Sequence, residues 1–288
     1  MSREVRGPTM RREVESILVA HKLDPSRREL YVEGRRDRAL LEWIVPIADR
    51  REASVKIIDE VVMPDVVEGG NRARVIAFLS AVEKEGHQIR GFIDADAAAI
   101  SGNDEPLPGN VWLTDVRDLE GYVIGVDNLK ATLQVGFARD GSLAEPMYAS
   151  MVQLARWLSA VRAVSVTQGL RLPVSEGRWF RYVSVDRPFG AVSVDKDRVL
   201  RQLLQAAGRS LSQLDQLRTD VTVIEAEQAT LPDSLVIHGR DAMRILTEQL
   251  RALNVDVPDI APTMWMTFKK EGYEQYPNLK SAVEFLKG

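Results

Sequence analysis

Residues 29–33 of this chain are Glu-Leu-Tyr-Val-Glu, and residues 89–94 are Ile-Arg-Gly-Phe-Ile-Asp. Each stretch has the short apolar character of a buried β-strand, and each ends on a carboxylate, at Glu33 and at Asp94. In parallel sheets, ligands bind beyond the carboxyl ends of the strands. If the two strands belong to one parallel sheet, Glu33 and Asp94 therefore lie at the same edge.

The first part of the chain alternates between helical and strand periodicity. The predicted elements are a helix over 11–21, a strand over 29–32, a helix over 37–48, a strand over 54–58, a helix over 72–84, and strands over 89–93 and 111–114. This alternation is typical of right-handed crossovers in a parallel sheet. We predict an α/β fold with a mostly parallel sheet flanked by helices.

Beyond about residue 125 the pattern becomes mainly helical. The predicted helices cover 126–135, 146–164, 199–206, 210–217 and 241–253, with candidate strands at 178–185 and 190–194. We therefore predict two domains, a catalytic α/β domain over 1–130 and a mainly helical C-terminal domain over 131–288.

Composition excludes several classes of protein. Of the 288 residues, 45% are hydrophobic and 28% are charged, as in ordinary globular proteins, and none is cysteine. Disulfides, thiol catalysis and cysteine-ligated metal sites are thereby excluded. The arginine-bearing N-terminus lacks a following apolar segment, and no stretch approaches the ~18 apolar residues of a membrane span. We expect a cytoplasmic protein without membrane contact.

The net charge of −4 is unlike that of a dedicated duplex-binding protein, which is usually basic. Nuclease sites nevertheless concentrate carboxylates and hold nucleic acid through local basic groups. Five arginines flank the first acidic motif: Arg27, Arg28, Arg35, Arg36 and Arg38. They are either a solvated surface or a phosphate-binding patch.

Glu33, Asp94 and Asp96 form the candidate catalytic centre. An Asp-x-Asp at a strand end brings two carboxylates together, and a glutamate from a neighbouring strand can complete a metal shell or shuttle a proton. Mg²⁺ prefers oxygen ligands and stabilises the charge that develops during phosphodiester cleavage. Gly34 is expected to let the backbone turn sharply beside a phosphate. The alternative is that these acids are capping or surface residues.

The order of these motifs resembles the toprim domain of topoisomerases, bacterial primases and OLD-type nucleases. This resemblance rests on Tyr31-Val32-Glu33-Gly34 and Asp94-Ala95-Asp96. Residues 31–37, 70–72, 114–122 and 238–241 also resemble a stand-alone toprim-like family, which includes the toprim effector of the PARIS anti-phage defence system.

The resemblance implies a magnesium-dependent, or manganese-dependent, toprim endonuclease that cleaves RNA, in particular tRNA. It also implies an ABC-type ATPase partner that holds this toxic effector until infection. A homodimer is left open. Two alternatives remain, a non-catalytic metal- or nucleotide-binding partner module and an OLD-like DNA nuclease. A phosphatase is disfavoured because its Asp-x-Asp typically follows the first strand of the sheet.

Many toprim proteins continue to a further acid after Asp-x-Asp, whereas residues 97–99 are alanines here. We predict that Glu120 supplies this catalytic carboxylate, with Asp115 and Asp118 as weaker candidates. A plain acidic helix start would look the same in sequence.

Four residues are candidate substrate contacts: Arg35, Arg36, His238 and Arg240. His238 could equally be an ordinary loop residue. The aromatic and basic run 264–270 would either stack bases or pack as core. Gly69-Gly70 is a candidate anion site, but it lacks the Lys-Ser/Thr ending of a P-loop, so the chain is not expected to be an ATPase itself.

Overall fold

A computed structural model describes residues 11–50, 52–63, 69–96 and 106–288. The chain divides into two compact units. The sheet unit comprises residues 1–115 together with 270–288, and the helical unit comprises residues 116–269. The predicted division falls after residue 130, whereas the sheet unit ends at residue 115 and regains residues 270–288, because the last helix of the chain packs on the sheet.

The sheet unit contains four parallel strands. In spatial order they are β3 (Ala53–Ile57), β2 (Arg28–Val32), β5 (Ile89–Ile93) and β6 (Val111–Leu113). From β2 the chain runs outward to β3, then crosses back to β5 on the other side of β2. The point at which the winding reverses lies between β2 and β5, and open α/β sheets bind ligands there. The predicted α/β fold class is confirmed.

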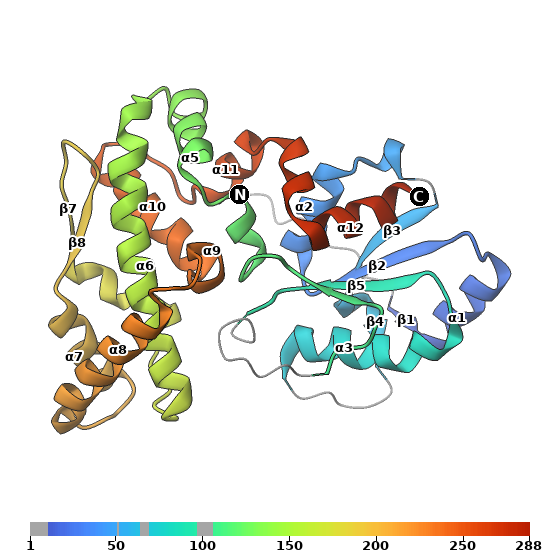
Figure 1. The fold of residues 1–288 in the computed structure, drawn as a ribbon, viewed down its shortest axis with the longest axis horizontal. Helices are drawn as coiled ribbons and strands as arrows, with labels where there is room; N and C mark the ends of the chain where they lie inside the picture. Colours follow the sequence, from blue (N-terminus) through green and yellow to red (C-terminus); the bar gives the residue numbers. More distant parts are fainter. Residues whose placement is uncertain (1–10, 51, 64–68, 97–105) are drawn as a thin grey trace, which may run out of the picture. The chain divides into compact units, whose positions relative to one another are not determined.

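Helices cover both faces of this sheet (Figure 1). The helices of the sheet unit are α1 (Val14–Leu23), α2 (Arg35–Ile44), α3 (Gly70–Val82) and α12 (Pro277–Lys287). One face packs α1 and α3 into a core that includes Ile17, Tyr31, Phe78 and Ile93. On the other face lie α2 and α12, and α12 contacts β2, β3 and β6.

Gly91 in β5 shows how closely α3 packs on the sheet. A Cβ atom at this position would lie 2.2 Å from Cδ1 of Leu79 and 3.3 Å from Cγ1 of Val75. The strand therefore needs a glycine here, and the close approach fixes α3 against β5.

A short pair of strands, β1 (Arg12–Glu13) and β4 (Val61–Val62), adds a parallel ladder that periodicity did not predict. With two residues each, these strands are too short to give an alternating pattern.

The helical unit is built around α6 (Ala144–Thr167), whose buried side chains include Met147, Met151, Leu158 and Val161. Its other helices are α5 (Val126–Ala131), α7 (Lys196–Ala206), α8 (Leu214–Gln228), α9 (Asp233–Val236), α10 (Gly239–Ala252) and α11 (Ala261–Thr267). Both α8 and α10 pack on α6. A hairpin of β7 (Val183–Val185) and β8 (Val192–Val194) completes the unit. The prediction of a mainly helical C-terminal part is confirmed.

None of the described helices has both the length and the apolar character needed to cross a membrane.

Candidate active site

Glu33 and Asp94 meet at the carboxyl edge of the sheet. They follow the adjacent strands β2 and β5, in which Val32 pairs with Phe92. The backbone N–H of Asp94 donates a hydrogen bond to Oε1 of Glu33 at 3.0 Å. The two carboxylates that are far apart in sequence are therefore neighbours at the reversal point of the sheet, although their catalytic roles stay predictions.

Asp96 lies next to this pair in a left-handed backbone conformation, with φ 48°. Aspartate tolerates this region better than most residues, because its short side chain can bond locally. The turn between Asp94 and Asp96 is tied to the neighbouring strand, since the N–H of Ala95 donates to Oγ1 of Thr114 at 2.9 Å. The following alanines, 97–99, lie outside the described residues.

The pKa of Glu33 is raised to about 7, mainly by burial and also by the charges of Asp96 and Asp37. The Asp94 hydrogen bond and the charge of Arg72 act in the opposite direction. A carboxyl group with such a pKa exchanges a proton close to neutral pH. Strong perturbation by burial and by like charges is characteristic of functional sites.

The first turn of α3 holds the backbone of both acids. Nδ2 of Asn71 donates to the carbonyl of Glu33 at 2.8 Å, and the Arg72 guanidinium donates to the carbonyl of Asp94. The chain enters this helix through Gly69 and Gly70, with φ 107° and 78°. Sequence reasoning placed neither Asn71 nor Arg72 in the site, although two signals were available: the glycine pair before a helix and the resemblance of residues 70–72 to the toprim-like family.

Gly34 begins α2 in a different manner from the one expected. Its φ of −149° and ψ of 179° are extended backbone that any residue adopts, and an added Cβ would meet only Oδ2 of Asp37 at 3.6 Å. The prediction of a sharp glycine turn is wrong. The N–H of Gly34 instead donates to Oδ2 of Asp37 at 2.7 Å, which caps the helix.

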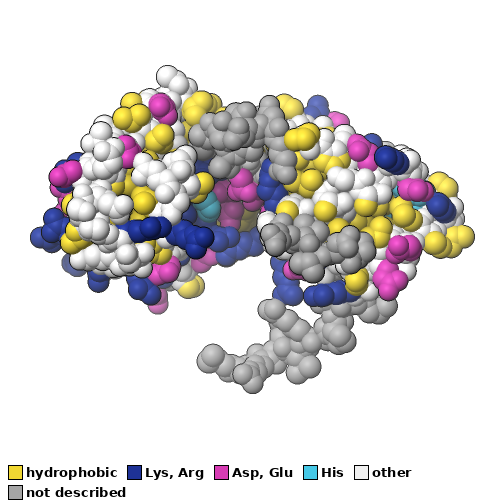
Figure 2. Space-filling model, turned by 90° about the horizontal axis from the view of Figure 1, so that it is seen from below, with side chains coloured by type: hydrophobic (Ala, Val, Ile, Leu, Met, Phe, Trp, Pro, Cys, Tyr) yellow, Lys and Arg dark blue, Asp and Glu magenta, His cyan; other side chains and the backbone are white. Residues whose placement is uncertain are grey.

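The arginines near the first motif divide into different groups. Arg27 is committed to Glu29, and Arg38 pairs with Glu42 and Glu60. Arg35 and Arg36 are exposed in the first turn of α2, directly after Glu33. Figure 2 shows basic and acidic side chains interspersed over the face that it draws. Phosphate binding by Arg35 and Arg36 stays a prediction.

Among the described residues, no three acidic or histidine side chains form a ready-made metal cluster. The donor chemistry nevertheless fits a hard divalent cation. Burial and, to a smaller extent, the charge of Asp96 raise the pKa of Glu33, and a cation between the two carboxylates would offset both effects. Mg²⁺ commonly keeps several waters and binds through one or two carboxylates plus substrate phosphate.

The three acids predicted as candidates for a further metal ligand follow strand β6 and lie in different places. Both carboxylate oxygens of Asp115 accept backbone N–H groups at the start of α12, from Asn278 at 2.8 Å and from Leu279 at 2.9 Å. Asp115 therefore caps a helix of the sheet unit. Asp118 and Glu120 belong to the helical unit. Asp118 lies just before a 3₁₀-helix over Leu119–Val123, and Glu120 lies in its first turn. The metal role of Glu120 stays a prediction.

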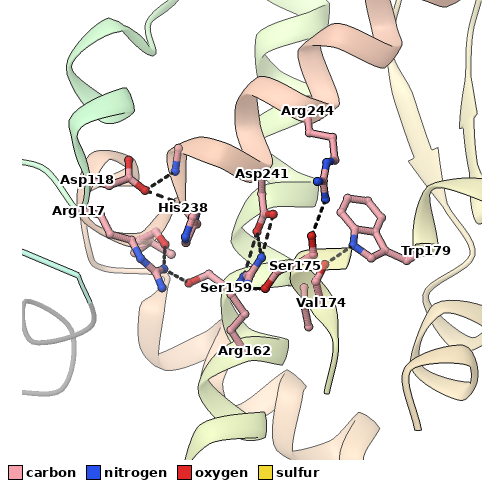
Figure 3. Close-up of polar contacts among 12 residues, drawn as sticks. Arg117, Asp118, Ser159, Arg162, Val174, Ser175, Trp179, His238, Asp241 and Arg244 are labelled. Carbon is pink, nitrogen blue, oxygen red and sulfur yellow. Dashed lines mark hydrogen bonds and ion pairs between the residues drawn. The ribbon is translucent and has the colours of Figure 1, made fainter. Parts of the chain in front are cut away.

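Asp118 is part of a buried polar cluster in the helical unit (Figure 3). Its Oδ2 accepts the N–H of Gly239 at 2.7 Å and lies 3.5 Å from Nδ1 of His238. A Cβ on residue 239 would come within 2.3 Å of Oδ1 of Asp118 and 2.5 Å of Cβ of Glu120. The His-Gly sequence thus lets α10 begin directly against Asp118.

Burial raises the pKa of Asp118 to about 7 and lowers that of His238 to about 4. The charge of Glu120 also raises the pKa of Asp118. The charge of Asp241 raises the pKa of His238, whereas the charges of three arginines lower it: Arg162, Arg117 and Arg240. His238 is therefore uncharged at neutral pH and offers a phosphate no positive charge. Arg240 is exposed at the start of α10.

An ion pair between Arg162 and Asp241 also holds the start of this helix. The Arg162 guanidinium binds both oxygens of Asp241, with distances of 2.8 to 3.0 Å. Arg117 donates to Oγ of Ser159 at 2.6 Å and to the carbonyl of Val236. The Arg162–Asp241 pair joins α6 to α10, and Arg117 joins α6 to the end of α9 within the helical unit (Figure 3). They give residues 238–241 a structural role, and substrate contact by His238 and Arg240 stays a prediction.

The late aromatic run packs within its own unit. Met264 and Phe268 are buried, and Nδ2 of Asn128 donates to the carbonyl of Met264 at 3.0 Å. These two side chains therefore pack in the core of the unit, as the alternative to base stacking predicted.

A scan against protein-family models finds no family that matches this chain, and a search of curated proteins finds no relative.

Proposed function

We propose that the chain is a magnesium-dependent toprim endonuclease, a hydrolase whose carboxylates Glu33, Asp94 and Asp96 hold the metal. Mn²⁺ would serve as a substitute. The substrate is RNA, in particular tRNA, and the protein acts as a toxic effector of anti-phage defence restrained by an ABC-type ATPase. The toprim resemblance of the sequence supports the substrate and the partner.

The observation that carries the proposal is the position of the acids. Glu33 and Asp94 follow adjacent parallel strands at the reversal point of the sheet, and the N–H of Asp94 binds the Glu33 carboxylate. Burial and the charges of Asp96 and Asp37 raise the pKa of Glu33 to about 7, against the Asp94 hydrogen bond and the charge of Arg72.

Bound at these carboxylates, Mg²⁺ would stabilise the charge on the attacking and leaving oxygens of a phosphodiester. Asp94 and Asp96 present two carboxylates from one turn, which Thr114 fixes through Ala95. Asn71 and Arg72 hold the backbones of Glu33 and Asp94 in place. Glu33 would bind the metal as the ionised carboxylate, so metal affinity would increase as the pH rises through about 7.

The decisive experiment incubates the purified chain with Mg²⁺ and with separate pools of tRNA, ribosomal RNA and DNA. We expect cleavage of tRNA that EDTA abolishes and that Mn²⁺ restores. Asp94→Asn is the inactive control, and Asp115→Asn is the matched control because Asp115 lies at the same sheet edge but caps α12.

The alternatives give distinct results. Cleavage of DNA with no action on RNA would favour an OLD-like DNA nuclease. Metal binding by calorimetry without cleavage of any pool would favour a non-catalytic metal- or nucleotide-binding partner module.

The effector role has a test in cells. Expression of the chain alone should arrest growth, and Asp94→Asn should remove the toxicity at equal protein level. Growth at the wild-type rate with an active nuclease would reject the effector role while leaving the enzymatic proposal standing.

A further inference from the structure

The sheet unit contains a pocket of about 600 Å³ at the carboxyl end of β3. This strand is a neighbour of β2, and its last residue, Ile57, pairs with Val32, the residue before Glu33. Because adjacent strands lie about 4.8 Å apart, the pocket lies one strand outward from the candidate metal site. Its volume falls within the range of ligand pockets in proteins.

Three segments of the chain form the wall of this pocket. One face of α2 contributes residues at helical spacing: Arg35, Arg38, Ala39 and Glu42. The end of β3 and the turn after it contribute three more: Ile57, Asp59 and Glu60. Arg11 joins them because the ladder of β1 and β4 pairs Arg12 with Val61, which places Arg11 alongside Glu60. The fold thus brings Arg11 and Arg35 into one pocket.

The carboxylates of this pocket already have cations. Arg74 donates to Oδ1 of Asp59 at 2.6 Å. Arg38 donates to Oε1 of Glu42 at 3.1 Å and to Oε1 of Glu60 at 3.2 Å. The three acids are therefore compensated by the protein itself.

Arg11 and Arg35 are the cations that remain. Both are exposed, and within the described part of the chain neither has a hydrogen bond or an ion pair. Arg50 adds a second cation to Glu42, so five arginines accompany three carboxylates and leave two positive charges. A ligand in the pocket can reach both exposed guanidinium groups, and the complementary ligand is an anion.

A phosphate group is the anion that suits this position. The guanidinium fork binds phosphate oxygens in pairs. A nucleic-acid strand carries a phosphate at every nucleotide, so a strand whose scissile phosphate lies at Glu33 presents another one close by. We propose that Arg11 and Arg35 hold a phosphate of the nucleic-acid strand beside the one that is cleaved. This inference rests on the proposed nuclease function, and it adds Arg11 to the substrate contacts.

Binding of labelled tRNA and of labelled single-stranded DNA to the full chain tests the inference. Fluorescence anisotropy is measured in EDTA on an Asp94→Asn background, so that no strand is cut. Arg11→Gln/Arg35→Gln should weaken binding at least about 10-fold and lower the slope of log affinity against log salt by about 1. The melting temperature should not change, because neither side chain has a described partner. Failure of the Asp94→Asn chain to bind either nucleic acid would overturn the inference.

The matched control is Arg187→Gln/Arg201→Gln, which removes the same charge from two exposed arginines of the helical unit. It should change neither the affinity nor the salt slope. An equal loss in both double variants would attribute binding to overall charge and would overturn the inference.

Calorimetry with inorganic phosphate distinguishes a strand from a small anion. If Arg11→Gln/Arg35→Gln abolishes the binding of free phosphate but leaves the affinity for tRNA and DNA unchanged, the pocket is a small-anion site and the inference is wrong.

Cleavage assays separate this inference from the proposed function. In the otherwise wild-type chain, Arg11→Gln/Arg35→Gln should raise KM for tRNA about 10-fold with kcat nearly unchanged, because the contact is made before and during the chemical step. Unchanged KM and unchanged binding would reject the phosphate site and leave the nuclease standing. Binding that depends on both arginines, without cleavage of any nucleic acid by the wild type, would reject the nuclease and leave a phosphate-binding pocket standing.

Discussion

Strand β2 has a glutamate at each end, and the two carboxyl groups have opposite electrostatics. At its start, Glu29 is fully buried and accepts hydrogen bonds from Tyr31 at 2.7 Å, Arg12 at 2.7 Å and Arg27 at 2.9 Å. Burial alone would raise the pKa of Glu29, but these bonds and the two guanidinium charges hold it at about 2. At the other end, burial and neighbouring acids raise the pKa of Glu33 to about 7.

The comparison separates a structural acid from a candidate functional one. Glu29 is surrounded by its counter-charges within the fold, so it is ionised and satisfied without any ligand. Glu33 is surrounded by Asp94, Asp96 and Asp37, with Arg72 as the opposing cation. The carboxyl edge of a parallel sheet is where ligands bind, and the proposed cation would there compensate the negative charge of these acids.

The largest expected difference is in activity. Glu33→Gln should reduce the proposed nuclease activity by at least about 100-fold, because it removes both the proposed metal ligand and a group that exchanges protons near neutral pH. Glu29→Gln should leave the rate nearly unchanged when it is assayed well below its melting temperature. Comparable loss in both variants would remove the functional distinction between the two ends of β2.

Stability should respond in the reverse order. Glu29→Gln should lower the free energy of unfolding by about 3 kcal/mol, because it leaves the part-buried Arg12 and Arg27 without their shared carboxylate. Denaturant unfolding of both variants at pH 7 measures this difference. A Glu29→Gln protein as stable as the wild type would show that the arginines find other partners.

The pH dependence sharpens the comparison further. The folded pKa of Glu33 is above the unfolded value, so its ionisation destabilises the fold, fully above pH 7 and decreasingly towards pH 4.5. Without metal, Glu33→Gln should therefore gain about 1–2 kcal/mol at pH 8 and almost nothing near pH 4.5.

The ionisation of Glu29 has the opposite effect on stability. Its depressed pKa contributes stability above pH 4.5 that is lost as the pH falls towards 2. Chemical unfolding of wild type and both variants between pH 3 and pH 8 checks the two slopes. A gain in Glu33→Gln that is equal at pH 8 and pH 4.5 would contradict the raised pKa of Glu33.

The smallest expected effect distinguishes two acids after the fourth strand. Asp115→Ala should cost about 1 kcal/mol of stability by removing the cap of α12, with normal Mg²⁺ dependence of cleavage. If Glu120 contributes to the metal site, Glu120→Gln should need more Mg²⁺ for half-maximal activity, and excess Mg²⁺ should partly restore the rate. Normal kinetics in Glu120→Gln would remove it from the site.

Much of the sheet unit could be predicted because its signals are local. Apolar periodicity located α3 and β5, and the strand ends marked Glu33 and Asp94. Asn71 and Arg72 were missed because they act through hydrogen bonds to backbone carbonyls across the sheet edge. Glycine at position 34 suggested a sharp turn, yet the identity of a residue permits a conformation without requiring it.

The sequence by itself determined the alternation of strands and helices and the two acidic strand ends, because these depend on side chains within a few residues of one another. Tertiary structure alone decided which acids are compensated. Asp115 is a helix cap only because the last helix returns to the sheet. The charge of the ionised Glu29 is compensated only because Arg12 and Arg27 both bind it. Charge compensation is a sum over neighbours in space, and a linear sequence does not contain those neighbours.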